Sequence, residues 1–385
     1  MDCSSAQPGQ ARPRLEIADV FRAAIPAFRD RYVPTRDQLK VMAAIQQCRT
    51  ASLGGHLDVC SKCGHERPSY NSCRNRHCPK CQCLAQARWI ARRQKRVIPT
   101  KYFHVVFTLP EPLRAFARAD PVAIYNLLFE SATCTLLDFG RSRLHAQIGV
   151  TAVLHTWTRD LRFHPHVHCI VTAGGLDDGS HWVRARSRFL FSVKAMSKVF
   201  RGKFVDGLAT LLRHSSQFAE LKPRLYDREW VVYAKEPFGG PAQVFHYLGR
   251  YTHRVGLSNH RLVSFDGHEV CFRTKHGKTC TIDAVEFIRR FLLHVLPARF
   301  VKIRHYGLVA AANVGTKLET ARRCLLASEN DCLHVTNPEL PSSWQDLFRA
   351  LTGIDLLVCP SCGARAVQSY PFTPGTSHAG RRDTS

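Results

Sequence analysis

The chain has 385 residues, with 55 Lys and Arg against 30 Asp and Glu, and a formal net charge of +25 with neutral histidines. Hydrophobic residues make up 45% and charged residues 22%, which indicates a globular protein and excludes a largely disordered one. Runs of about 18 apolar residues are absent, and the polar N-terminus lacks the apolar core of a secretory signal. We therefore expect no membrane contact, a cytoplasmic location and a polyanionic partner such as nucleic acid.

Two helices are predicted at the start of the chain, after a loose tail over residues 1–14. Apolar residues recur at helical spacing from residue 15 to 47, and Pro34-Thr35-Arg36-Asp37 restarts the second helix. Residues 1–47 form the first of four expected segments. The second, residues 48–98, holds a cysteine-rich stretch and then a basic helix that ends near Pro99.

Cysteine and histidine residues in the second segment have the spacing of zinc ligands. The chain has 16 cysteines, and several of those between residues 48 and 83 stand in Cys-x-x-Cys pairs. Such clustering in a long chain favours metal over disulfides. Two pairs can share one tetrahedral zinc ion: Cys60, Cys63, Cys78 and Cys81. Four more residues can form a second, interleaved structural site: Cys48, His56, Cys73 and His77.

Basic residues around these ligands are candidates for DNA contacts. Arg74 and Arg76 lie on the loop that a metal ion would stiffen, and Arg92 and Arg93 lie on the basic helix. A solvated helix face explains the last two equally well. A further pair, Cys359 and Cys362, stands alone near the C-terminus and is interpreted as a broken or borrowed half-site.

The third segment, residues 99–310, predicts a mixed α+β domain with an antiparallel sheet. Strands are expected over 102–109, 150–158, 166–172 and 230–234, and a hairpin over 261–274 turns at Asp266-Gly267. Helices are expected over 113–137, 189–212, 241–254 and 284–295. The fourth segment, residues 311–385, contains the lone cysteine pair and a loose tail.

Histidines at alternate positions mark one predicted strand. In the sequence His164-Pro-His166-Val-His168, the period of two places His166 and His168 on one face, where they can hold one divalent ion. Surface histidines are common, so this pattern alone is weak. His155 lies on the preceding strand and faces this pair if the hairpin loop has an even length. Gln243 is the alternative third ligand, while His104 and His164 are interpreted as supporting or structural residues.

Paired tyrosines lie further along the chain on the helix predicted over 241–254. Tyr247 and Tyr251 are four residues apart and so share a helix face. A pair of core aromatics is the plain interpretation. However, Arg250 and Arg254 make the helix basic, and a phenol that attacks a phosphodiester needs a metal and nearby cations.

Five motifs in this order resemble a known family: SCRNRHCPKCQ, YFHVVFTLP, HPHVHCIV, YLGRYTHR with SNHRL, and EFIRRFLLHVLP with IRHYG. From about Leu39 to Gly307 the chain is similar to the two-tyrosine HUH transposases of the insertion-sequence-91 (IS91) type. The resemblance implies an HUH-nuclease sheet flanked by helices and an N-terminal zinc-binding domain. It maps the HUH pair onto His166 and His168, and the nucleophiles onto Tyr247 and Tyr251.

The implied activity is rolling-circle-like transposition of a bacterial insertion sequence, in the nucleoid, with Mg or Mn as catalytic ion and Zn as structural ion. Single-stranded DNA at the transposon ends and target DNA are the implied partners; a homo-oligomer and host replication proteins are both open. Two alternatives remain: a non-catalytic zinc-dependent DNA-binding protein, and a plasmid replication initiator or relaxase of the HUH type.

Overall fold

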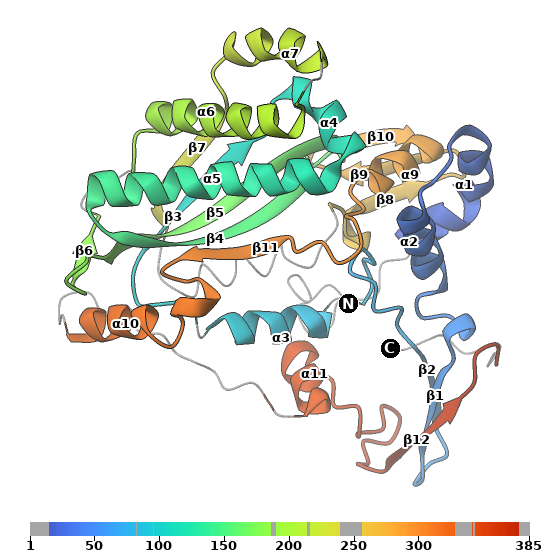
Figure 1. Cartoon of the computed structure of the whole chain (residues 1–385). Coiled ribbons are helices and arrows are strands. Elements are labelled where there is room, and N and C mark those ends of the chain that lie inside the picture. The colour runs from blue at the N-terminus through green and yellow to red at the C-terminus, as the bar shows by residue number, and fades with distance from the viewer. Residues whose placement is uncertain are drawn as a thin grey trace.

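The computed structural model describes residues 15–81, 83–94, 96–185, 190–213, 216–238, 256–327, 341 and 343–376. This part of the chain has the predicted α+β architecture: it holds antiparallel sheets together with helices (Figure 1). Three hydrophobic clusters lie within the described residues.

The central sheet carries the histidine motif. Its strands lie in the order β11 (Ile303–Gly307), β4 (Gln147–Trp157), β5 (Phe163–Leu176), β3 (Tyr102–Thr108) and β7 (Val232–Phe238), and β6 (Trp182–Arg184) pairs with β5. Side chains alternate across β5, so that Val167 and Cys169 point into the core while His166 and His168 take the other face. The histidine side of the sheet carries a smaller hydrophobic cluster, in which Val153 and Ile170 pack with Leu318, so the histidines lie beside a second packed region.

Helices cover the core side of this sheet, where Figure 1 draws them above the strands. They are α4 (Arg114–Ala119), α5 (Pro121–Leu144), α6 (Val193–Leu211) and α7 (Ser216–Tyr226). The helix expected over 113–137 is divided between α4 and α5, because Asp120 caps α5 and Pro121 occupies its first turn. By length and composition alone α5 could cross a membrane, but 56% of its apolar window is buried, as in a core helix of a globular domain.

The N-terminal helices pack on a second, smaller sheet. Helices α1 (Ile17–Arg31) and α2 (Arg36–Gln47) share a core with α9 (Ala284–Leu292) and with strands β8 (Leu262–Phe265), β9 (Glu269–Arg273) and β10 (Thr279–Asp283). Phe21 and Phe291 meet edge to face at the centre, with ring centroids 5.3 Å apart. The first helices of the chain are therefore folded together with residues that follow 256.

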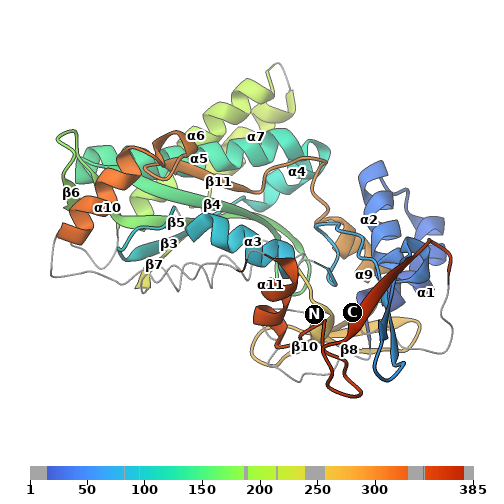
Figure 2. The ribbon, with the colours of Figure 1, turned by 90° about the horizontal axis from the view of Figure 1, so that it is seen from below.

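A third sheet combines a strand near the C-terminus with two strands of the cysteine-rich segment. Its strand order is β12 (Val367–Phe372), β1 (Gly55–Cys60) and β2 (Glu66–Tyr70), so the C-terminal strand pairs with the cysteine-rich stretch (Figure 2). Helices α3 (Cys83–Gln94) and α11 (Trp344–Thr352) lie beside each other near this sheet. Helix α10 (Lys317–Ala327) and four 3-10 turns complete the described elements: η1 (Ala51–Leu53), η2 (Glu111–Leu113), η3 (Asn259–Arg261) and η4 (Ala311–Asn313).

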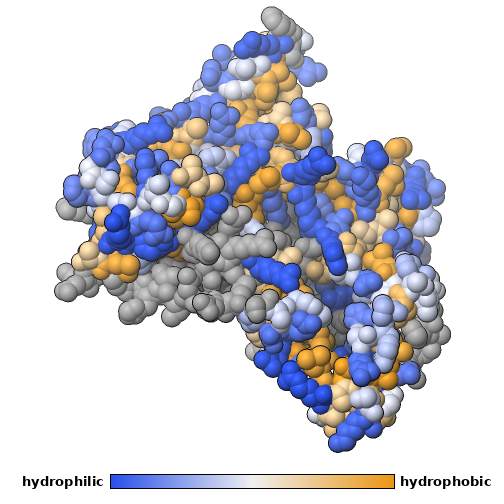
Figure 3. Space-filling model, turned by 60° about the horizontal axis from the view of Figure 1, so that its bottom comes forward, coloured by the Kyte–Doolittle hydropathy of each residue, from blue (hydrophilic) through white to orange (hydrophobic). Residues whose placement is uncertain are grey.

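On the face of the molecule drawn in Figure 3, hydrophilic and hydrophobic side chains are intermixed, and the hydrophobic ones form several separate patches.

Candidate functional site

Three imidazoles converge on the face of the central sheet opposite helices α4 to α7. The antiparallel register of β4 and β5 places His155 directly opposite His166, and His168 lies two residues further along the same face. The ligand atoms of these three residues all lie within 4.8 Å of one another. The ring centroids of His155 and His168 are 4.2 Å apart, and those of His166 and His168 are 4.8 Å apart. We call this group the His cluster.

Hydrogen bonds fix how two of these rings are presented. His166 donates from Nδ1 to the carbonyl oxygen of His164 at 2.6 Å, which leaves its Nε2 with the lone pair. His168 Nδ1 lies 2.8 Å from Nε2 of His104, which belongs to the neighbouring strand β3. If His168 donates this bond, its Nε2 is the ligand atom, and His104 acts as the outer partner that orients it. His164 itself accepts a hydrogen bond from Arg114 at Nδ1.

Burial keeps these imidazoles neutral at ordinary pH. It lowers the pKa of His104 and of His166 to about 4, and it lowers the pKa of His155 and His168 well below the usual value of an imidazole. Trp157 adds to the enclosure, because its ring stacks on that of His155 at 4.9 Å between centroids. Neutral imidazole is the form that binds metals, so the His cluster fits a divalent cation.

The predicted nucleophiles belong to the stretch between β7 and η3. Tyr247, Tyr251, Arg250, Arg254 and the alternative ligand Gln243 lie outside the described residues. The chain resumes at Gly256, whose backbone lies against Trp157: a Cβ atom there would be 2.8 Å from that ring. The described chain therefore returns beside the His cluster immediately after this stretch.

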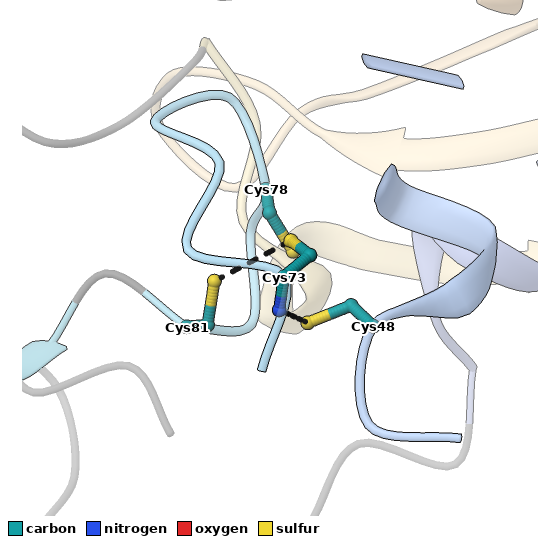
Figure 4. A group of neighbouring side chains, drawn as sticks. All are labelled: Cys48, Cys73, Cys78 and Cys81. Carbon is teal, nitrogen blue, oxygen red and sulfur yellow. Dashed lines mark hydrogen bonds between the residues drawn. The ribbon is translucent and has the colours of Figure 1, made fainter. Parts of the chain in front are cut away.

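Four thiols form a first group, the loop thiol cluster, from the end of α2 and the loop before α3: Cys48, Cys73, Cys78 and Cys81. Cys73 donates its backbone N–H to the sulfur of Cys48 at 3.5 Å, and its own sulfur lies 3.7 Å from that of Cys81 (Figure 4). Four sulfurs around zinc are about 3.8 Å apart, given Zn–S bonds of about 2.3 Å, whereas a disulfide needs about 2.05 Å. The arrangement therefore fits tetrahedral zinc.

Four further thiols form a second group, the split thiol cluster: Cys60, Cys63, Cys359 and Cys362. The sulfur of Cys60 lies 3.7 Å from that of Cys362, and the sulfur of Cys63 lies 3.7 Å from that of Cys359. This corrects the pairing expected from the sequence, which joined Cys60 and Cys63 to Cys78 and Cys81. Strand β1 pairs with β12, and the turn at the end of β1 that carries Cys60 and Cys63 therefore lies beside Cys359 and Cys362.

The two histidines expected to complete the second zinc site lie apart from both thiol groups. His56 lies on β1, opposite Ser69 of β2 and Pro371 of β12. His77 is buried, and its Nε2 accepts the backbone N–H of Leu296 at 3.2 Å. Burial lowers the pKa of His77 to about 3, so this ring is neutral and connects the cysteine loop to the chain after α9.

The four candidate DNA-contacting arginines are placed differently. Arg74 is exposed on the cysteine loop, in a left-handed conformation with φ 52°. The guanidinium of Arg76 instead donates to the carbonyl oxygens of Leu296, Pro297 and Phe300. Arg92 and Arg93 lie on α3, and their side chains are outside the described part of the structure. Contact of all four with DNA stays a prediction.

Sequence reasoning missed the partner of Cys359 and Cys362, although a signal was present. Both Cys60–Gly64 and Cys359–Gly363 read Cys-x-x-Cys-Gly, whereas Cys78 and Cys81 lack the following glycine. The contact between His104 and His168 had no sequence signal beyond the position of His104 on a predicted strand.

Comparison with known proteins gives two family matches and two relatives. A family described as "Putative transposase" matches residues 149–316, and one described as "Transposase zinc-binding domain" matches residues 20–109. The "Putative transposase y4qJ" of Sinorhizobium fredii is 42% identical over 381 residues, 91% of this chain and 94% of the relative. The "Transposase for insertion sequence element IS801" of Pseudomonas savastanoi pv. phaseolicola is 26% identical over 353 residues, 86% of this chain and 83% of the relative. No solved structure matches the chain.

Proposed function

Because the chain belongs to the IS91-type family of two-tyrosine transposases, we propose that it nicks and joins single-stranded DNA through a 5′-phosphotyrosine intermediate. This chemistry would drive rolling-circle-like transposition of an insertion sequence. DNA is the substrate of a transposase; single-stranded transposon ends and target DNA are the specific substrates we propose.

The convergence of His155, His166 and His168 on one sheet face is the observation that carries this proposal. Their ligand atoms lie within 4.8 Å of one another, and all three rings are kept neutral by burial. These imidazoles would hold Mg or Mn, and the bound ion would supply Lewis-acid polarisation of the scissile phosphate. The remaining steps depend on the chain's own side chains.

Tyr247 and Tyr251 are the proposed nucleophiles. The phenolic oxygen of one attacks the scissile phosphorus and loses its proton to solvent or a base. The bond to the 3′ oxygen breaks, and that oxygen takes up a proton. The products are a 5′-phosphotyrosine and a free 3′-OH that can prime replication. The phosphoester is conserved, so no nucleotide cofactor is needed, and the second tyrosine is available for the target strand.

The position of the tyrosines along the chain is compatible with this role. Tyr251 precedes Gly256 by five residues, a span of at most about 18 Å. Gly256 lies against Trp157, which stacks on His155. Arg250 and Arg254 belong to the same stretch, and their guanidinium groups are proposed to stabilise charge on the phosphate in the transition state.

The zinc-binding domain is proposed to recognise the end of the element. The loop thiol cluster fits a structural zinc ion, and Arg74 is exposed on the loop that this ion would stiffen. Helix α3 follows directly and carries Arg92 and Arg93. Contacts of this kind position DNA through its phosphates.

A denaturing gel tests the proposed chemistry. The protein is mixed with labelled single-stranded DNA from the element's end, with Mg or Mn or with EDTA. We expect a metal-dependent adduct that resists heat and SDS and is absent from the Tyr247→Phe/Tyr251→Phe double variant. Tyr226→Phe is the matched control, because Tyr226 is exposed at the end of α7 on the core side of the sheet.

Two outcomes would contradict the assignment. An adduct that survives in the double variant would exclude these tyrosines as nucleophiles. DNA binding on a native gel without any adduct in the wild-type protein would favour a non-catalytic DNA-binding protein. The variants His166→Ala and His168→Ala should lose the adduct while keeping DNA binding, as expected for ligands of the catalytic ion.

A further inference from the structure

The split thiol cluster joins parts of the chain that are far apart in sequence. Cys60 and Cys362 are separated by 302 positions, and Cys63 and Cys359 by 296, yet each pair of sulfurs is 3.7 Å apart. The matched zinc-binding family covers residues 20–109. This range contains Cys60 and Cys63 but not Cys359 or Cys362.

The two halves of this cluster are built alike. Gly64 donates its N–H to the carbonyl of Cys60, and Gly363 donates to the carbonyl of Cys359, both at 2.9 Å. The N–H of Cys60 donates a hydrogen bond to the carbonyl oxygen of His65, and the N–H of Cys359 donates one to the carbonyl oxygen of Ala364, both at 2.9 Å. Each glycine has a left-handed φ, of 70° and 71°, which a side chain would strain. Two equivalent knuckles thus present two thiols each.

The surrounding fold holds the knuckles face to face. The β1–β12 ladder runs up to the cluster, where Cys60 pairs with Val367 and Ser61 donates to the carbonyl of Ala366 at 2.9 Å. Within this sheet, Asp58 and Arg67 form a buried ion pair at 2.9 Å. Each also contacts the C-terminal segment: Asp58 accepts from Ser369 at 2.7 Å, and Arg67 donates to the carbonyl of Leu356 at 3.2 Å.

We propose that Cys60, Cys63, Cys359 and Cys362 bind a second structural zinc ion, which fastens the C-terminal segment 343–376 to the zinc-binding domain. A separation of 3.7 Å matches the edge of a tetrahedral zinc–thiolate centre, about 3.8 Å, and excludes a disulfide. Since α11 packs against α3, this ion also fixes α11 beside the basic helix. The inference is independent of the proposed strand-transfer chemistry.

Counting zinc in the purified full-length protein tests the proposal. The count is made in a His166→Ala/His168→Ala background, because the His cluster could also hold zinc. This chain should bind two zinc ions, one in each thiol cluster, and the cysteine variants are made in the same background. The variants Cys60→Ser/Cys63→Ser and Cys359→Ser/Cys362→Ser should each lose one, and the variant with all four substitutions should also lose only one. In the second variant, amide hydrogen exchange should rise in β12 and α11 and stay unchanged in the central sheet.

Matched variants separate the site from general effects of losing thiols. Cys271→Ser/Cys280→Ser removes two half-buried thiols from the β8–β10 sheet and should keep both ions. Cys362→His preserves a ligand and should keep both ions where Cys362→Ser loses one. Should the serine variants not fold, wild-type protein loaded with Co²⁺ should still show twice the thiolate charge-transfer absorption of a single four-thiolate site.

Three results would overturn the proposal. One is full zinc content in the Cys359→Ser/Cys362→Ser variant, which would leave the C-terminal pair without a metal. Another is loss of both ions in the variant with all four substitutions. The third is a chain in the His166→Ala/His168→Ala background that binds one zinc ion, or one equivalent of Co²⁺, per molecule.

Discussion

His104 contacts His168 and through it influences the geometry of the His cluster. Its Nε2 lies 2.8 Å from Nδ1 of His168, and the two rings are stacked with centroids 5.1 Å apart. An outer partner of this kind sets the tautomer and direction of a metal-binding imidazole. His104 is therefore a positioning residue in the proposed site, and its loss should alter metal binding before it alters DNA binding.

Replacing His104 by Phe should raise the metal concentration needed for half-maximal adduct formation by about 10–100-fold. His104→Gln, which retains a hydrogen-bonding group, should recover part of this loss. Mn²⁺ titrations of adduct formation measure both effects. His276→Asn is the control, since His276 is exposed and has a left-handed φ of 55° that Asn tolerates. Equal titration curves for His104→Phe and wild type would contradict the positioning role.

The donor set of the His cluster predicts a metal preference. Among the described residues, it offers three imidazole nitrogens and no carboxylate. Mg²⁺ favours oxygen ligands, whereas Mn²⁺ accepts imidazole more readily. Adduct formation in protein freed of metal should therefore need several-fold less Mn²⁺ than Mg²⁺. His155→Asp adds an oxygen ligand and should narrow the difference. A wild-type protein that works equally well with both ions would argue against this ligand set.

At the scale of elements, two arginines on the cysteine loop, Arg74 and Arg76, lie in different surroundings although they are two positions apart. Arg76 donates to three backbone carbonyls after α9, and His77 accepts the N–H of Leu296, so this part of the loop is fastened to the chain that follows α9. Arg74 is exposed. Arg76 therefore stabilises the fold, whereas Arg74 is available to contact a phosphate.

Alanine substitutions should separate these two roles. Arg76→Ala should lower the free energy of unfolding by about 2 kcal/mol, because it leaves carbonyls without their charged donor. Arg74→Ala should change stability by less than about 0.5 kcal/mol, but reduce the salt dependence of DNA binding by about one phosphate contact. Urea unfolding and binding titrations at several salt concentrations give the two numbers. The reverse pattern would place the DNA contact on Arg76.

The hairpin of β4 and β5 shows what local pattern can predict. The residue pattern predicted both strands, and the structure does place His155 opposite His166. The loop between the paired residues Trp157 and Phe163 is not of even length, however: it comprises residues 158–162, and a register shift between His155 and Trp157 produces the observed pairing. The zinc ligands show the opposite case. Proximity in sequence suggested that Cys60 and Cys63 share an ion with Cys78 and Cys81, but pairing of β1 with β12 decides the partner. Contacts across hundreds of residues leave no periodicity in the sequence.

At the scale of the whole molecule, buried histidines make stability depend on pH. Burial lowers the pKa of His294 to about 4, and its ring bonds Thr156 and the carbonyl of Leu161. An unfolded imidazole has a pKa of about 6.5. Between pH 6.5 and 4 the unfolded chain therefore binds a proton that the folded chain does not, and stability falls as the pH falls.

His294 alone should account for roughly 3 kcal/mol of this loss. His294→Gln removes the titrating group and keeps a donor for the carbonyl of Leu161. Its unfolding free energy should consequently fall less steeply than that of wild type between pH 6.5 and 4. The difference between the two proteins in urea melts cancels any pH effect on the thiols. Parallel curves would show that His294 does not titrate on unfolding.

The split thiol cluster also bears on synthesis of the chain. Cys60 and Cys63 leave the ribosome early, and their partners follow 296 or more positions later. At about 5–20 residues per second, the delay is on the order of tens of seconds. During that time the first knuckle is an open half-site, exposed to oxidation and to other metals. A copy of the gene truncated before Cys359 would never close it, so this cluster distinguishes complete polypeptides from unfinished ones.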